Sequence, residues 1–167
     1  MWLFALWGIA GVLLLLGQAI ARLTPLALEP VLDGSLGPLE WSLYGGWVAL
    51  NAYAEGYRGF QKGFAPRVVA RALHVGRHRQ PLRVILAPLF CMGLFGATRR
   101  RLIASWAILL MVVVLVTMMR FVPQPWRGIV DGGVVVGLVW GGAAIAAFTM
   151  AALSGREPAA SPDVPGP

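Results

Sequence analysis

Charged residues are scarce in this chain: Lys, Arg, Asp and Glu together make up 13% of its 167 residues. A typical soluble domain carries about 25%, so a water-soluble monomer is not expected. Hydrophobic residues reach 58% and come in long blocks, which excludes a disordered chain. The composition indicates an all-α, polytopic membrane protein that uses the lipid bilayer as its solvent.

Residues that could serve as metal ligands or catalytic groups are also few. The single cysteine, Cys91, excludes an intrachain disulfide and a Cys₄ zinc site, and the two histidines, His74 and His78, are too few for a multi-histidine metal centre. The chain contains no GxSxG elbow, no HExxH pair and no phosphate-binding loop. We therefore expect no catalytic residues, no metal site, no cofactor and no enzymatic activity.

Four charge-poor stretches are long enough to cross a bilayer, which takes about twenty helical residues. They cover residues 2–21, 39–57, 102–119 and 129–153. The sequence Ala19-Ile20-Ala21 resembles a signal-peptidase site, but no Lys or Arg precedes the first stretch, which favours an uncleaved helix. We expect residues 1–153 to form a single helical domain and the proline-rich tail, 154–167, to be disordered.

A further uncharged stretch, 84–98, is too short to cross as a straight helix. Its fifteen residues would cover about 22 Å, less than the hydrocarbon core of about 30 Å. If it is re-entrant or interfacial, the four full spans leave eleven Lys and Arg inside and three outside. If it crosses, five spans leave nine inside and five outside. The positive-inside rule favours four spans, with both termini cytoplasmic, and five spans are the alternative.

Polar side chains recur along one face of the second predicted span. The members of this stripe are Glu40, Tyr44, Asn51, Glu55 and Arg58. One interpretation is a polar path or a headgroup-binding groove. The other places Glu40 and Glu55 at opposite membrane interfaces, with Asn51 making an interhelical hydrogen bond. The spacing of three residues also predicts that Glu55 and Arg58 neutralise each other.

Two overlapping GxxxG motifs lie on the last predicted span, at Gly133, Gly137 and Gly141. Glycines at this spacing let another helix backbone approach closely. The packing partner is predicted to be the first or second span of the same chain, with a homo-oligomer or a partner subunit as the alternative.

Basic residues are concentrated between the second and third full spans. The net charge is +7, and ten of the fourteen Lys and Arg lie between Arg58 and Arg101. Residues 64–83 are predicted to form a basic amphipathic helix on the membrane surface. The expected contacts to anionic lipid headgroups or to a partner are Arg67, Arg71, Arg77, Arg79, Arg83, Arg99, Arg100 and Arg101. No nucleic-acid motif accompanies these charges, so nucleic acid is not an expected partner.

The sequence thus predicts a small, non-catalytic protein of the bacterial inner membrane. It would act as an accessory, assembly or lipid-interacting subunit with an Arg-rich cytoplasmic face. The bacterial assignment comes from composition, because Lys62 is the only lysine among fourteen basic residues in a chain rich in Ala, Gly and Val. A small oligomeric transporter or channel that uses the polar stripe is the alternative.

Overall fold

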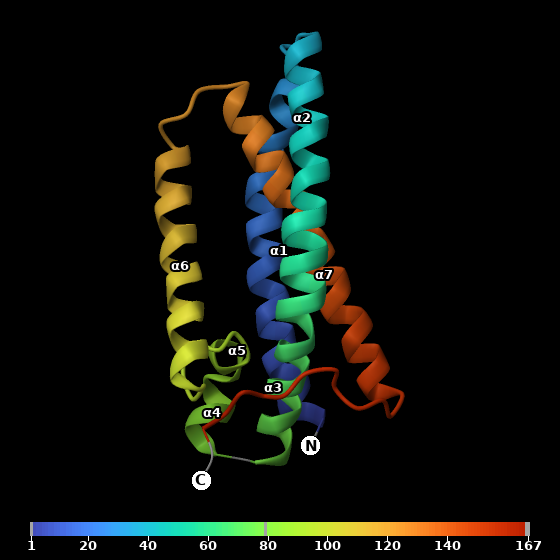
Figure 1. Cartoon of the computed structure of the whole chain (residues 1–167), viewed down its shortest axis with the longest axis vertical. Helices are drawn as coiled ribbons and strands as arrows, with labels where there is room; N and C mark the ends of the chain where they lie inside the picture. Colours follow the sequence, from blue (N-terminus) through green and yellow to red (C-terminus); the bar gives the residue numbers. More distant parts are fainter. Residues whose placement is uncertain (1, 79, 166–167) are drawn as a thin grey trace.

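The computed structural model describes residues 2–78 and 80–165, and no strand occurs among them. About 80% of the chain is helical, which confirms the all-α class. The first helix, α1 (Trp2–Leu32), packs antiparallel to the last, α7 (Trp126–Leu153), as Figure 1 shows. Between them come α2 (Pro38–Asn51), the π-helix η1 (Ala52–Phe64), α3 (Ala65–Arg77), α4 (Pro81–Ile85), α5 (Ala87–Cys91) and α6 (Arg99–Met119).

Three helices, α1, α6 and α7, are long and apolar enough to cross a membrane. Their 31, 21 and 28 residues correspond to about 46, 31 and 42 Å of helix. The fourth predicted span, 39–57, is not confirmed. The α-helical part, α2, ends after 14 residues, and the helix continues as η1, which carries Glu55, Arg58 and Lys62. The three apolar helices are compatible with an integral membrane protein.

The segments α2, η1 and α3 follow one another without a break from Pro38 to Arg77, so they form one long rod with a π-helical middle. Pro38 begins the rod in the first helical turn, where its missing N–H would have no helical partner in any case. In a π-helix each N–H bonds five residues back instead of four. The rotation per residue is therefore smaller, and side-chain spacing along η1 departs from the α-helical pattern.

Residues 84–98 belong to a hairpin at one end of the bundle. The helices α4 and α5 are five residues each, and the chain turns at Gly93 and Gly96, whose φ angles are +80° and +58°. These left-handed values favour glycine. A Cβ atom added to Gly96 would lie 4.0 Å from Nε of Arg83, so the two ends of the segment meet. The segment does not run along the bundle as a fifth crossing helix would.

The largest buried cluster lies where α1, α3, α5 and α7 meet. It contains Ala5, Ile9, Val12, Ala65, Val68, Val69, Ala72, Leu73, Cys91, Ala144, Ile145 and Ala152. Ten of the thirteen residues of α3 are buried. The surface helix predicted over 64–83 is thus replaced by an internal helix that ends at Arg77, because neighbouring elements cover both of its faces.

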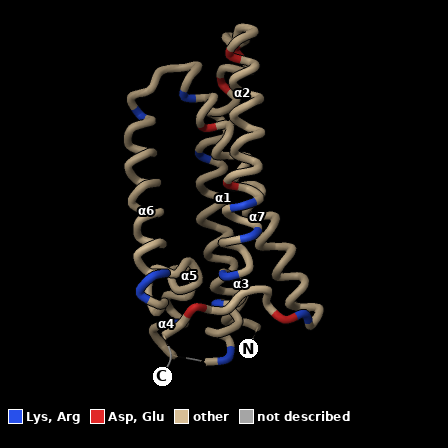
Figure 2. The backbone as a smooth tube through the Cα atoms, in the orientation of Figure 1, with Lys and Arg blue, Asp and Glu red and all other residues tan. Residues whose placement is uncertain are grey.

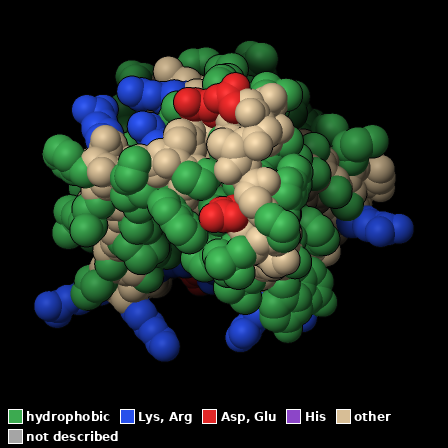
Figure 3. All heavy atoms as spheres, turned by 90° about the horizontal axis from the view of Figure 1, so that it is seen from above, with side chains coloured by type: hydrophobic (Ala, Val, Ile, Leu, Met, Phe, Trp, Pro, Cys, Tyr) green, Lys and Arg blue, Asp and Glu red, His purple; other side chains and the backbone are tan. Residues whose placement is uncertain are grey.

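We call the end of the bundle that holds α3, α4, α5 and the start of α6 the basic end. Figure 2 shows Lys and Arg gathered towards it, and both chain termini lie there in Figure 1. The opposite end holds Glu29, Asp33 and Glu40, where α1 ends and α2 begins. Viewed from above, that end shows acidic side chains set among hydrophobic ones (Figure 3). The bundle is therefore polarised in charge along its long axis.

The segment 154–165, expected to be disordered, follows an irregular but defined path back across the basic end. The backbone N–H of Thr98 donates to the carbonyl oxygen of Asp163 at 2.9 Å. Val164 packs on a small buried cluster formed by Val75, Ala87 and Phe90. The prolines prevent regular secondary structure in this segment. Its backbone nevertheless forms a hydrogen bond with the bundle, and the side chain of Val164 packs against it.

Candidate functional site

The polar stripe and the glycine strip pack against each other. The facing groups are Gly132 with Tyr44, Gly133 with Trp47 and Asn51, Gly137 with Glu55, and Gly141 with Phe60. A Cβ atom at Gly133 would lie 2.6 Å from the Trp47 ring and 2.7 Å from Nδ2 of Asn51, closer than real Cβ atoms approach. The glycines therefore serve close packing between α7 and the α2–η1 rod of the same chain.

Three hydrogen bonds involve the stripe residues Tyr44 and Asn51 and the neighbouring Trp47, and one of them reaches α7. The Tyr44 hydroxyl donates to the carbonyl oxygen of Ala27 on α1 at 3.1 Å. The indole Nε1 of Trp47 donates to the carbonyl oxygen of Val130 on α7 at 3.3 Å. Asn51, which is 6% exposed, donates from Nδ2 to the carbonyl oxygen of Trp47 at 2.9 Å, within its own helix. These contacts occupy the face that a polar path would need.

The charged members of the stripe lie apart from one another. Glu40 is in the first turn of α2, whereas Arg58 is exposed on η1. Within the described ranges, the one ion pair closer than 4.0 Å joins Arg127 and Asp131. The expected neutralisation of Glu55 by Arg58 is therefore not found there. The reason is the π-helical geometry, in which residues three apart do not align as they do on an α-helix.

Glu55 and Arg58 are exposed side chains beside the charge-free part of α7. That part runs from Gly132 to Leu153, and its midpoint falls close to Gly141. Gly141 faces the ring of Phe60, two residues from Arg58. The exposed side chains of Glu55 and Arg58 therefore lie near the middle of the charge-free stretch of α7, rather than near the ends of that stretch.

A shallow apolar groove of about 650 Å³ runs along α7 beside η1. It is lined by Gln61, Val136, Val139, Trp140, Ala143, Ala144, Ala147, Phe148 and Ala151. Gln61 accepts a hydrogen bond from Nε1 of Trp140 at its Oε1 atom, at 2.8 Å. None of the five predicted stripe residues lines this groove, so the groove and the stripe are separate features.

Arg71 was expected to contact lipid headgroups, but the structure buries it, with 1% of its surface exposed. Its guanidinium group donates to four backbone carbonyl oxygens, those of Phe90, Phe95, Gly96 and Pro162. It also lies 4.0 Å from the centroid of the Phe90 ring. Burial lowers the pKa of Arg71 to about 10. Because its donors are used inside the protein, Arg71 is removed from the expected lipid contacts.

The other predicted arginines surround this buried one. Arg77, Arg99 and Arg100 are exposed, Arg67, Arg83 and Arg101 are half-buried, and Arg79 lies outside the described residues. Nη1 of Arg83 lies 3.3 Å from Nε2 of His74, whose ring stacks on His78 with the centroids 4.5 Å apart. Burial lowers the pKa of His74, and the charges of His78 and Arg83 add to this effect. The neutral imidazole can therefore accept a hydrogen bond from Arg83.

Arg67 on α3 and Arg101 in the first turn of α6 are both half-buried. The charges of Arg67 and Asp163 act on Arg101 in opposite senses: the first repels its guanidinium group and the second attracts it. The Nε atom of Arg67 is buried and has no hydrogen-bond partner in the described part of the chain. The basic end therefore carries an excess of positive charge beside the one carboxylate of Asp163.

Gln124, which no local sequence pattern indicates, fastens the loop between α6 and α7 to α1. Its Nε2 donates to the carbonyl oxygen of Leu26 at 3.1 Å and to Oε2 of Glu29 at 2.9 Å. Its Oε1 accepts from the backbone N–H of Gly128 at 2.9 Å. Glu29 is 95 residues away in the chain, so no local pattern indicates this contact.

Comparison of the chain with known family models, curated proteins and solved structures finds no match. Any assignment of function therefore depends on the residues and their geometry.

Proposed function

We propose that this protein is a non-catalytic accessory or assembly subunit of a membrane complex, which contacts a partner membrane protein through the charged surface of η1. The supporting observation is the exposure of Glu55 and Arg58 near the middle of the charge-free stretch of α7. A charged side chain at the centre of a bilayer costs about 2.5–3.5 kcal/mol on insertion scales. A polar partner that covers both side chains removes this cost.

The proposed topology has four crossings, of which α2 and η1 together make the second. In Figure 1, α1 and α6 run away from the basic end, while η1 and α7 run towards it. Residues 84–98 then form a re-entrant or interfacial hairpin between the second and third crossings. The positive-inside rule places the basic end and both termini in the cytoplasm, for which the bacterial inner membrane is the proposed location.

The exposed arginines of the basic end are proposed to contact anionic lipid headgroups. Arg77, Arg99 and Arg100 are suited to this role because their side chains are exposed. Basic residues close to a membrane surface contribute about 1 kcal/mol each to attraction by anionic lipids. The alternative function as a transporter or channel has less support, because the polar stripe packs against the α7 glycines.

Site-specific photo-crosslinking in native membranes tests the subunit role. A photoreactive residue in place of Tyr53, which is 58% exposed on η1, is expected to give a discrete protein adduct. The matched control is Val113, which is 54% exposed on α6 and is expected to face lipid. Replacing Glu55 and Arg58 with Gln should weaken the adduct from position 53, because the charges that the partner covers are gone.

An adduct containing two copies of this chain would identify the partner as a second copy, and an adduct of another mass would identify a different subunit. Either adduct supports the proposal. The same adduct pattern from positions 53 and 113, or no protein adduct from position 53, would contradict it.

A further inference from the structure

A second hollow, of about 230 Å³, continues the apolar groove of α7 towards the basic end. The groove and the hollow share Phe148 and Ala151 as wall residues, so we treat them as one feature, the extended groove. The wall residues of the second hollow are Pro66, Val69, Phe148, Ala151, Ala152, Arg156, Glu157, Pro158 and Ala159. The extended groove is therefore apolar along α7 and has one cation and one anion at its mouth.

The position of this charged mouth is fixed by the way α7 ends. The helix stops at Leu153, and Gly155 follows with a left-handed φ of +86°. The backbone N–H of Gly155 donates to the carbonyl oxygen of Ala152 at 3.1 Å. The backbone N–H of Arg156 donates to the carbonyl oxygen of Ala151 at 3.0 Å. These two bonds form a Schellman motif, which anchors Arg156 at the C-terminus of the helix, where a cation is favoured.

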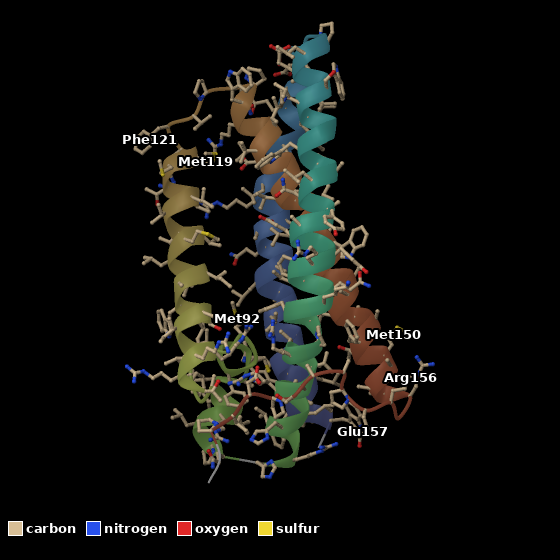
Figure 4. The ribbon with its side chains drawn as sticks, in the orientation of Figure 1. Met92, Met119, Phe121, Met150, Arg156 and Glu157 are labelled. Carbon is tan, nitrogen blue, oxygen red and sulfur yellow. The ribbon has the colours of Figure 1, made fainter. Side chains whose placement is uncertain are left out.

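Arg156 and Glu157 are exposed side chains, and Figure 4 shows both just beyond the end of α7. Within the described ranges, neither of them forms an ion pair closer than 4.0 Å. The mouth therefore offers a guanidinium group and a carboxylate on consecutive residues. A ligand with a phosphate and an ammonium group complements both charges. Guanidinium groups bind phosphate oxygens, and carboxylates accept hydrogen bonds from ammonium groups.

The depth of the mouth is suited to a lipid headgroup. The charge-free part of α7, from Gly132 to Leu153, makes about 33 Å of helix, close to the hydrocarbon core of about 30 Å. The mouth lies just beyond this part, at the level of the lipid phosphates if the helix spans the core. The apolar wall from Val136 to Ala151 covers about 22 Å of helix. This length exceeds the half of the core that one leaflet fills, about 15 Å, so one acyl chain can lie along it.

The groove is hollow because small side chains form part of its wall. Ala143, Ala147 and Ala151 lie four residues apart, on one face of α7. Trp140 on the same wall donates a hydrogen bond to Gln61 of η1. The volume of about 650 Å³ is within the range of small-molecule sites, about 300–1,000 Å³. A lipid fills the apolar part and also pairs with both charges of the mouth, which an apolar helix does not.

We propose that the extended groove binds one phosphatidylethanolamine molecule. Its phosphate group pairs with Arg156, its ammonium group pairs with Glu157, and one acyl chain lies along the alanine face of α7. This inference rests on the membrane location in the proposed function. It goes beyond that function, because the subunit role uses the charged surface of η1 and assigns nothing to the groove.

Native mass spectrometry of the full chain in mild detergent tests the headgroup preference. The chain is titrated with phosphatidylethanolamine, phosphatidylcholine or phosphatidylglycerol of identical acyl chains. One phosphatidylethanolamine is expected to bind saturably, about tenfold more tightly than either of the others. Phosphatidylcholine carries a positive charge without an N–H donor, and phosphatidylglycerol carries no positive charge, so neither can donate an ammonium hydrogen bond to Glu157.

Blocking the groove tests the acyl-chain site. Ala146 and Ala147 are consecutive exposed residues of α7, and of the two only Ala147 lines the groove. The variant Ala147→Phe fills the groove and is expected to weaken phosphatidylethanolamine binding by about tenfold or more. The matched control, Ala146→Phe, adds the same side chain outside the groove and should change binding by less than about twofold.

Charge variants test the headgroup contacts. Glu157→Gln should weaken phosphatidylethanolamine but not phosphatidylglycerol, so the preference between the two lipids is lost. Arg156→Gln should weaken all three lipids, because all three carry the phosphate group. The controls Asp33→Asn and Arg120→Gln remove the same charges from exposed side chains at the opposite end of the bundle. Each control should change binding by less than about twofold.

Four results would overturn the inference. Equal affinity for the three lipids, or equal weakening by Ala146→Phe and Ala147→Phe, would mean unspecific lipid around the helix. An unchanged lipid preference in Glu157→Gln would contradict the headgroup contacts. A protein, rather than a lipid, released by Ala147→Phe would mean a docking surface for a partner helix. Slow thiol labelling of the buried Cys91 checks that each variant folds. If Ala147→Phe unfolds, Ala147→Leu replaces it, and unchanged lipid binding would contradict the site.

The crosslinking experiment at Tyr53 distinguishes this failure from failure of the proposed function. A discrete adduct at position 53 without selective loss of lipid in Ala147→Phe overturns the lipid site and leaves the subunit role intact. Selective loss of lipid without the adduct supports the lipid site and contradicts the subunit role.

Discussion

The guanidinium group of Arg71 donates a hydrogen bond to the carbonyl oxygen of Pro162 at 2.7 Å, across 91 residues of chain. The same side chain bonds the carbonyl oxygen of Phe90, at the end of α5. One buried cation therefore holds α3, the hairpin and the C-terminal segment together through backbone acceptors. The sequence pattern suggests that Arg71 contacts lipid, but in the structure this side chain is a central contact that holds the fold together.

The Arg71→Gln variant is expected to lose about 3 kcal/mol or more of stability, because several buried carbonyl groups lose their donor. Thermal unfolding in detergent, followed by maleimide reaction at Cys91, measures this loss. The exposed Arg77 on the same helix provides the control, and Arg77→Gln should change stability by less than about 0.5 kcal/mol. Equal unfolding midpoints for both variants would contradict the central role of Arg71.

The Cys91 thiol is expected to be nearly inert in the folded protein. It is 2% exposed, and burial raises its pKa to about 12. Because the thiolate is the reactive form, three pKa units lower the reaction rate by about 1000-fold at pH 8. Iodoacetamide labelling followed by mass spectrometry measures the rate, and denaturation should restore rapid labelling. Fast labelling of folded protein would mean that the core at the basic end is open.

The Gly133→Ala variant should disturb the contact between α7 and the rod, because its Cβ would lie 2.6 Å from the Trp47 ring. We expect a loss of about 1–3 kcal/mol, typical of overpacking. At Gly142 nothing lies within 4 Å of an added Cβ. Gly142→Ala is therefore expected to be neutral or to stabilise by about 0.5–1 kcal/mol through helix propensity. Thermal unfolding compares the two variants, and a larger loss at Gly142 would contradict the packing described.

Stability is expected to fall as the pH drops below about 6.5, the ordinary pKa of histidine. Folding lowers the pKa of His74, so the unfolded chain takes up the proton more readily and stability increases with pH. The contribution is fully present above pH 6.5 and is lost progressively towards the lower pKa of the folded state. Unfolding midpoints between pH 7.5 and 5.5 measure it. His74→Gln should flatten this dependence, whereas His78→Gln should retain most of it; identical profiles would contradict the assignment.

The helices that carry long apolar runs were predictable from the sequence. The predicted spans 2–21, 102–119 and 129–153 fall on α1, α6 and α7, because the length of an uncharged run is a local property. The π-helical form of η1 was not predictable from spacing alone. It changes the positions of Glu55 and Arg58 relative to each other, and the ion pair expected at a spacing of three residues is absent from the described structure.

The sequence by itself determined a helical chain with apolar stretches long enough to cross a bilayer and most of its basic charge in one region. These properties depend only on the order of residues. Only the tertiary structure decided that Arg71 is buried while Arg77 is exposed on the same helix. The physical reason is that burial depends on which distant segments cover a helix, here the hairpin at Phe90 and the segment at Pro162.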